Sequence, residues 1–225
     1  MAAAYGRSLG SGTQDGGPTS IVITVGANAS VGEKLVMAMG FFQNATPTVT
    51  DSGSNTWTVN HYRQSGDQSS LALAWADCTT ALTSGVSTIT AEWGELITGL
   101  ATAHALTGTE SGAPTASGAT EDFLVTSWHT ADTTTTDGSV LFGGCSVRYG
   151  AALTNTAVRG TERYDNGISV MHLFAQSNEY AVGSASSDIA GSLSDAPDFI
   201  FNMAHYGWGP LPTPPAPSVI AWIRG

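Results

Sequence analysis

Short stretches in which large apolar residues alternate with small or polar ones recur along the chain, and this alternation constrains the fold more than any other feature. In an extended Ser70–Cys78, the side chains of Leu71, Leu73 and Trp75 lie on one face and three alanines lie on the other. Thr56–Tyr62 alternates in the same way. A period of two is that of a β-strand, whereas a helix repeats about every 3.6 residues. The pattern therefore predicts an all-β protein.

Turn signals separate these stretches at near-regular intervals. Asn166-Gly167 predicts a tight hairpin turn between Arg159–Tyr164 and Ile168–Phe174, and Asp137-Gly138 predicts another turn before an apolar strand. Many short strands with regular turns are typical of an antiparallel two-sheet sandwich, here jelly-roll-like. The predicted strands are Thr19–Val25, Glu33–Phe42, Thr56–Tyr62, Ser70–Cys78, Val86–Trp93, Gly99–Leu106, Phe123–Trp128, Ser139–Val147, Ala157–Tyr164, Ile168–Ala175, Tyr180–Ser184, Phe199–Ala204 and Ser218–Arg224.

The two ends of the chain differ in composition from its middle. Residues 1–18 are rich in glycine and small polar residues, which bury too little apolar area to offset the entropy of ordering, so we predict a flexible N-terminal arm. Residues 19–225 show no internal boundary and are predicted to form one β-sandwich domain. Residues 207–217 contain five prolines, which exclude a helix or a central strand, so this segment is predicted to be an extended surface excursion.

The charge balance argues against a nucleic-acid partner. The chain has 18 acidic residues against 7 basic ones, a net charge of −11, and Lys34 is its only lysine. Nucleic-acid binding normally uses clustered basic residues to displace counterions, and the arginines here are scattered. No apolar run approaches the roughly 20 residues of a membrane span, and the amino terminus lacks the pattern of an export signal. We therefore expect no nucleic-acid binding and no membrane insertion.

Two sequence features leave alternatives open. Cys78 and Cys145 each lie in an apolar stretch, which favours two buried free thiols over a disulfide, although the sequence does not show whether they are close enough to pair. The segment Asp51–Asn55 offers oxygen atoms for calcium, but it lacks the acid count of a calcium-binding loop. An Asx-type turn is the favoured interpretation of that segment.

No residue pattern predicts catalysis. The five histidines occur singly and outside any zinc-binding spacing; they are His61, His104, His129, His172 and His205. Glu92 and Glu95 flank a tryptophan and Glu121-Asp122 are adjacent, but neighbours in sequence do not define a catalytic cleft. We therefore predict no catalytic residues, no metal site and no cofactor, in a protein that is not an enzyme.

The best lead to a binding site is a pair of aromatic residues near the proline-rich segment. Tyr206 and Trp208 precede Pro210, Pro212 and Pro214, and a rigid loop presenting both rings would suit docking onto a protein or stacking on a sugar. These five residues are the predicted binding residues. The alternative is that the aromatic residues fold back over a sheet edge.

The order of several segments resembles a family of β-sandwich domains found in tailed-phage virion proteins and in bacterial extracellular proteins. The similarity covers about Ser20 to Arg224. It rests on Val49–Thr58, the Ala-Trp-Ala around Trp75, Ser87–Thr90, Gly138–Gly144 and the small-residue segment Ser218–Arg224. The proline-rich segment and Phe199–Tyr206 depart from the family pattern. The resemblance implies a structural or adhesive module without common catalytic residues.

Three functional hypotheses follow from these observations. The first is a virion surface protein of a tailed phage, either a capsid decoration protein or a minor tail protein. Such a protein binds other virion proteins, forms a homo-oligomer and has adhesion to a host-surface glycan as a further role. The second is a secreted, extracellular carbohydrate-binding or adhesion module. The third, a glycan-cleaving enzyme, requires two acids facing each other across a groove.

Overall fold

A computed structural model describes residues 1–17, 19–42, 45–62, 70–95, 97–122, 126–148, 153–168, 171–194 and 201–212. These residues form sixteen β-strands and no helix, and every strand pair is antiparallel. The predicted all-β antiparallel sandwich is confirmed. The strands are β1 (Ala4–Gln14), β2 (Ser20–Thr24), β3 (Lys34–Phe41), β4 (Thr48–Asp51), β5 (Thr58–Tyr62), β6 (Ser70–Asp77), β7 (Thr88–Glu92), β8 (Gly99–Thr107), β9 (Ala116–Asp122), β10 (Ser127–His129), β11 (Ser139–Arg148), β12 (Asn155–Arg159), β13 (Thr161–Ile168), β14 (Met171–Tyr180), β15 (Ala190–Leu193) and β16 (Phe201–Trp208).

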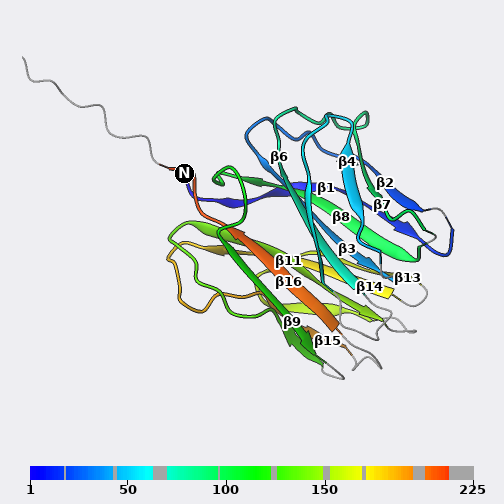
Figure 1. Ribbon diagram of the computed structural model, residues 1–225. Coiled ribbons are helices and arrows are strands. Elements are labelled where there is room, and N and C mark those ends of the chain that lie inside the picture. Colours follow the sequence, from blue (N-terminus) through cyan, green and yellow to red (C-terminus); the bar gives the residue numbers. More distant parts are fainter. Residues whose placement is uncertain are drawn as a thin grey trace, which may run out of the picture.

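The strand order shows an internal duplication. Strands β1 to β8, the N-terminal half, form a five-stranded sheet of order β1-β8-β3-β6-β5 and a three-stranded sheet of order β2-β7-β4. Adding eight to each strand number gives the order of the C-terminal half, which is β9-β16-β11-β14-β13 and β10-β15-β12. An eight-stranded pair of sheets with these pairings is a jelly roll. The chain is thus two jelly rolls of the same topology in tandem (Figure 1).

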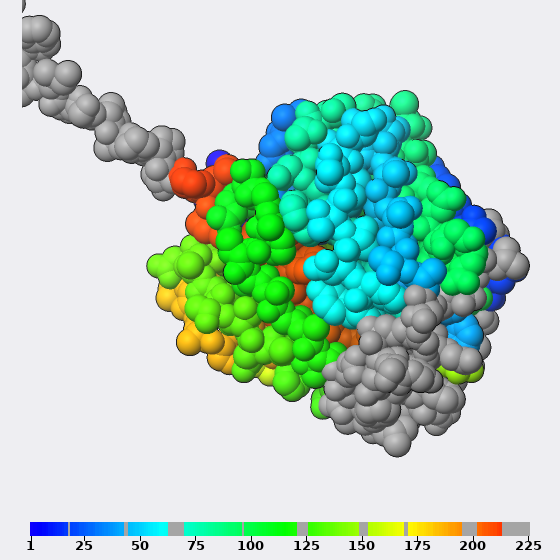
Figure 2. All heavy atoms as spheres, in the orientation of Figure 1, coloured from blue at the N-terminus to red at the C-terminus, as the bar shows by residue number. Residues whose placement is uncertain are grey.

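The four sheets are stacked as layers, with the two five-stranded sheets in the middle. One apolar core fills each half between its own two sheets, and a third core lies between the two five-stranded sheets. We call this third core the junction; it includes Val36 and Leu73 from the N-terminal half and Phe142, Leu173 and Trp208 from the C-terminal half. In Figure 2 the surfaces of the two halves meet along one boundary.

The double coverage of the central sheets explains their composition. Strands β3 and β11 are almost entirely buried because each contacts one core on each face. On β6 the predicted alternation is confirmed: Leu71 and Leu73 face the junction, whereas Ala72, Ala74 and Ala76 face the core of the N-terminal half. On the neighbouring strand β3 the distribution is reversed, because Met37 and Met39 face the core of the N-terminal half and Ala38 faces the junction.

The predicted flexible arm is wrong for most of its length, because residues 4–14 form edge strand β1. This strand pairs with β8 from Ala4 to Gln14, and the side chain of Leu9 is fully buried. Its glycines permit close packing: a Cβ atom added at Gly12 would lie 2.6 Å from Cγ2 of Ile21. The composition of this segment suggests disorder. Hydrogen bonds to the main chain of β8 and close packing against β2 nevertheless make it an ordered strand.

Several strand boundaries also differ from the prediction. Asn166-Gly167 lies inside β13, and the pairing of Ile168 with Met171 puts the hairpin connection after residue 168 rather than at Asn166-Gly167. Strands β9 and β15 lie where no strand was predicted. Residues 181–184 lie beyond the end of β14, so the predicted strand Tyr180–Ser184 is not observed. The predicted last strand, Ser218–Arg224, lies outside the described residues.

Candidate functional site

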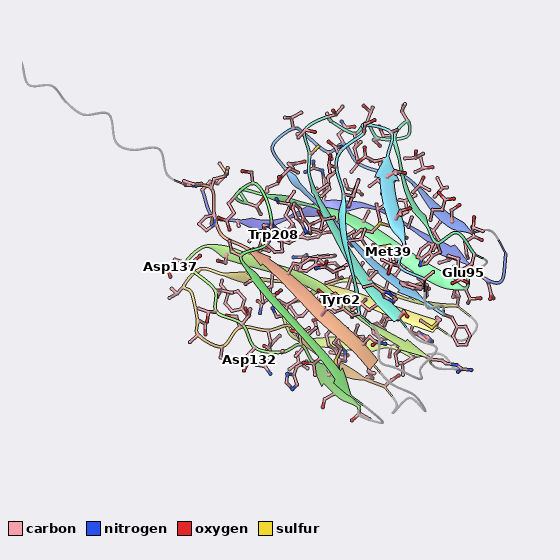
Figure 3. The ribbon with its side chains drawn as sticks, in the orientation of Figure 1. Met39, Tyr62, Glu95, Asp132, Asp137 and Trp208 are labelled. Carbon is pink, nitrogen blue, oxygen red and sulfur yellow. The ribbon has the colours of Figure 1, made fainter. Side chains whose placement is uncertain are left out.

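The predicted aromatic pair lies in the junction and not on the surface. Tyr206 and Trp208 are 1% and 0% exposed, and their rings pack edge to face with centroids 5.9 Å apart. Figure 3 shows Trp208 in the layer between the halves. Strand β16 extends to Trp208 because β11 and β9 pair with it on both sides. The prediction that these two rings form a surface contact is therefore wrong.

After Trp208 the chain reaches the molecular surface, where the first prolines of the proline-rich segment lie. Pro210 is partly buried and forms an isolated bridge with Thr109, whereas Pro212 is exposed. Leu211 between them is 43% exposed. Pro214 lies outside the described residues. Of the five predicted binding residues, the structure thus leaves Pro210 and Pro212 at the surface, where they can contact a partner.

A polar hollow lies on the C-terminal half at β13 and β14, and we call it the polar groove. It encloses about 290 Å³ and is lined by Gly160, Thr161, Arg163, Ser177, Asn178 and Glu179. A second hollow of about 250 Å³ shares Glu179 and extends over residues Ala2–Ala4. The lining residues come from β13, β14 and the residue between β12 and β13, close to the start of β1.

An irregularity in β13 places Arg163 in the polar groove. In the pairing of β13 with β14, Arg163 is the extra residue between the pairs Glu162↔Gln176 and Tyr164↔Ala175. On β1 a second irregularity separates Tyr5 from Arg7. A bulge locally turns the strand and changes the direction of a side chain. Here the guanidinium carbon of Arg163 lies 3.7 Å from the centroid of the Tyr5 ring, across the boundary between the halves.

Hydrogen bonds hold this Arg163–Tyr5 pair in place. Arg163 Nε donates to Ser177 Oγ at 2.8 Å, and the main-chain N–H of Tyr5 donates to Glu179 Oε1 at 3.0 Å. Arg163 Nη2 also lies 3.8 Å from Glu179 Oε1. Because both partners of Arg163 lie on β14, the guanidinium is positioned before any ligand arrives.

The Tyr5 ring connects the polar groove to a buried histidine. The hydroxyl of Tyr5 lies 3.1 Å from Nδ1 of His104, and Nε2 of His104 lies 2.8 Å from Thr102 Oγ1. Burial, with the positive charge of Arg163, lowers the pKa of His104 to about 3. Burial raises the pKa of Tyr5, and the charge of Arg163 opposes that rise. His104 is therefore neutral at physiological pH and serves the junction structurally.

The polar groove can bind a small polar molecule. Its lining brings together a guanidinium, a carboxylate, an amide and hydroxyl groups, which are suited to hydrogen bonding with the hydroxyls of a sugar, and the Tyr5 ring packs against the guanidinium. The residue pattern does not predict this site, because a bulge leaves no clear signature in a sequence and Tyr5 lies in the predicted arm. Gly160, beside the groove, has a φ of 106°, but a single glycine in the sequence does not indicate such a conformation.

The Asp51–Asn55 segment forms the favoured Asx-type turn. Asp51 Oδ1 accepts hydrogen bonds from the main-chain N–H groups of Gly53 at 2.7 Å and Asn55 at 3.3 Å. Its Oδ2 accepts one from Trp57 Nε1 at 2.7 Å. Since N–H donors occupy both carboxylate oxygens, this carboxylate is not available to a calcium ion. Among the described residues, no group of three or more His, Cys, Asp or Glu side chains could hold a metal ion.

The remaining candidates have structural positions. Cys78 and Cys145 are free and buried in two different cores, one in each half. Glu92 and Glu95 are both exposed near the end of β7, and the side chains of Glu121 and Asp122 lie outside the described residues. In the part of the chain that the structure covers, no helix is long and apolar enough to cross a membrane.

Comparisons with protein-family models, with curated proteins and with solved structures found no match.

Proposed function

We propose that the protein is a structural virion surface protein of a tailed phage, a capsid decoration or minor tail protein that acts through protein–protein contacts and not as an enzyme. The observation that carries the proposal is the duplicated jelly roll with a shared apolar junction. Two jelly rolls joined by a shared apolar core form a single block with an outer three-stranded sheet at each end. Such a block suits a role in assembly, where the spacing between two contact faces matters.

The outer sheets supply the faces for these contacts. On the outer face of the β2-β7-β4 sheet, Val22, Thr90 and Thr50 form a row across the strands, and Val22 is 55% exposed. In the other half a row of hydroxyl side chains crosses β10, β15 and β12. Faces with hydroxyls and methyl groups but few charges lose little hydration energy on contact. They support packing against other virion proteins or further copies of this chain.

Binding to phage particles tests the proposal. The purified protein is mixed with capsids and, separately, with tails that lack it, and bound protein is measured by co-sedimentation and located by electron microscopy. We expect saturable binding at symmetry-related positions and weaker binding by Val22→Glu, which puts a charge on an outer face. Substituting Ser54, a turn residue away from the outer faces, by Gly is the matched control. Absence of binding to both particles contradicts the proposal.

The polar groove favours a second candidate function, namely recognition of a glycan by a host-adhesion or secreted, extracellular module. A glycan array tests it, with Arg163→Ala and Glu179→Ala as groove variants. Arg159→Ala removes an arginine outside the groove and is the matched control. The second function predicts a signal that the two groove variants lose and the control keeps. An array without a signal contradicts it, and release of sugar from a bound glycan would instead indicate an enzyme.

A further inference from the structure

The only lysine of the chain is fully buried beside the junction. Lys34 begins β3, its side chain is 1% exposed, and its register partner on β6 is Asp77. The Nζ atom contacts Asp77 Oδ1 directly and donates to the main-chain carbonyl of Gly112 at 2.6 Å. A lysine that a protein uses only for solubility would lie in solvent, so this position requires another explanation.

Two tryptophan rings enclose the amine. Nζ lies 4.9 Å from the centroid of the Trp75 ring and 5.6 Å from that of Trp208, one from each half. Trp208 Nε1 also donates to the carbonyl of Gly112 at 3.3 Å. The rings remove water from the amine, and this desolvation lowers the pKa of Lys34 while Asp77 and Glu110 oppose the shift. Desolvation is the usual way in which a protein makes a lysine nucleophilic.

The main chain at Gly112 binds both partners through two adjacent peptide units. The N–H of Gly112 donates to Asp77 Oδ2 at 2.8 Å, and the carbonyl of Gly112 accepts from Lys34. The main chain thus fixes both reacting groups against each other. The side chain of Asp77 is 35% exposed, so a departing water molecule can reach solvent.

A second carboxyl group is available to move protons. Glu110 lies two residues before Gly112, and its charge acts on Lys34. Its Oε1 accepts the main-chain N–H of Gly209 at 2.9 Å, which fixes its position next to the start of the proline-rich segment. An amine, a carboxyl group and a neighbouring carboxyl group in a water-poor site are the groups that amide formation needs.

We propose that Lys34 and Asp77 condense to an intramolecular isopeptide bond that joins β3 to β6. Glu110 first passes one proton from the Lys34 ammonium to Oδ1 of Asp77, and the neutral amine then attacks Cγ of the protonated carboxyl group and forms the C–N bond. The negative charge that develops on Oδ2 is stabilised by the N–H of Gly112, as in an oxyanion hole. The C–Oδ1 bond then breaks, and Oδ1 leaves as water with that first proton and a second proton that Glu110 transfers from Nζ.

The overall reaction conserves atoms and charge. A lysine ammonium and an aspartate carboxylate give one amide and one water, without oxidant, reductant or activating group. The product keeps the existing contacts, since the new amide N–H donates to the carbonyl of Gly112 and the new amide oxygen accepts from its N–H. The bond closes a loop that contains β4 and β5, and a covalent link of this kind restricts the unfolded chain.

The nearby pair Arg7–Glu33 shows what an unreactive ion pair looks like in the same half. Its side chains are 31% and 14% exposed, so both keep access to water. A guanidinium stays charged at any physiological pH and is a poor nucleophile. Lys34 differs in its burial, in its aromatic enclosure and in the main-chain N–H and carbonyl of Gly112, which bind both partners.

Intact mass spectrometry of the denatured full-length protein tests the proposal. We expect a mass one water molecule below that of the sequence, and a digest in which the peptide with Lys34 is linked to the peptide with Asp77. Lys34→Arg and Asp77→Ala restore the full mass, and Asp77→Asn loses ammonia instead of water. Glu110→Gln keeps both reacting groups but forms the bond more slowly or not at all. Glu33→Gln, in the other ion pair, is the matched control and still loses water.

The wild-type measurement keeps the test independent of whether a variant folds. A folded wild-type protein with the full mass of its sequence, unchanged after prolonged incubation at neutral pH, overturns the proposal. Loss of water that persists in Lys34→Arg, or that maps to an aspartate–glycine step such as Asp137-Gly138, overturns it as well.

Discussion

Two buried histidines, His104 in the junction and His205 in β16, show how single residues couple the fold to pH. Burial is the main cause that lowers their pKa values, to about 3 for His104 and about 4 for His205. The unfolded chain has histidines of pKa near 6.5, so below that pH it binds protons that the folded chain does not. Above pH 6.5 the two histidines therefore do not reduce the free energy of unfolding. Below pH 6.5 the free energy of unfolding falls, down to about pH 4 for His205 and about pH 3 for His104.

This linkage gives the first prediction. Between pH 6 and pH 4 each histidine lowers the free energy of unfolding by roughly 1.4 kcal/mol per pH unit. Urea unfolding at several pH values measures the slope, and His104→Asn and His205→Asn isolate it from the titration of carboxyl groups. Each variant is expected to have a shallower slope than the wild type. Equal slopes would show that these histidines do not govern the acid response.

The two cysteines give a second prediction. Burial is the main cause that raises the pKa of Cys78 to about 11, and burial raises that of Cys145 as well. Since the reactive species is the thiolate, a thiol reagent at neutral pH should react very slowly with the native protein. In denaturant, without reductant, both thiols should react at once. A protein without reactive thiols in denaturant would contain a disulfide and contradict the separate positions of the two residues.

Local chemistry was predictable wherever neighbours in sequence determine it. The turn at Asp51 was predictable because its carboxylate bonds main-chain groups two and four residues away. Trp208 was not, because Gly207-Trp208-Gly209-Pro210 has the composition of a loop. Trp208 is buried because β16 pairs with β11 and because the N-terminal half covers the junction. Both of these are distant from Trp208 in the sequence.

At the scale of the elements, β1 shows how composition misled the prediction. A glycine-rich composition favours disorder, yet in β1 the small size of glycine leaves space for the side chains of β2. A Cβ atom at Gly12 would meet Ile21, whereas one at Gly17 would have nothing within 4 Å. Strands with clear alternation, such as β6, were predictable; short strands of small residues, such as β9 and β15, were not, because pairing rather than apolar pattern defines them.

The third prediction compares these two glycines. Gly12→Ala should lower the free energy of unfolding by about 1–3 kcal/mol, as expected when an added methyl group overfills a packed site. Gly17→Ala should leave it almost unchanged. Denaturant unfolding followed by tryptophan fluorescence measures both. If residues 4–14 were a flexible arm, the two variants would unfold alike, and that result would contradict the assignment of β1.

At the scale of the whole molecule, the duplication has no visible counterpart in the residue pattern. The two halves share the pairing of their strands, and jelly-roll topology is defined by pairing and not by residue identity. The alternation predicted sheets with a buried face, but it did not show that the two five-stranded sheets bury both faces. The chain is therefore two jelly rolls that share an apolar junction between their five-stranded sheets.

The junction yields the fourth prediction, which concerns the independence of the halves. Contacts between domains of one chain are usually small and polar, so that each domain folds alone. Here the interface is a core with buried Phe142, Leu173 and Trp208 facing Val36 and Leu73, and an isolated half would expose this surface to water. Fragments 1–113 and 114–225 should aggregate or remain partly folded when produced separately.

The same fragments should form a soluble one-to-one complex when they are produced together, because each covers the apolar sheet of the other. Size-exclusion chromatography and circular dichroism of the separate and combined fragments measure this. Trp208→Ala in the second fragment removes the largest junction side chain and should weaken the complex by about 3–5 kcal/mol. Val182→Ala, at an exposed position, is the control. Two fragments that each unfold cooperatively as monomers would show that the junction is a contact between independent domains.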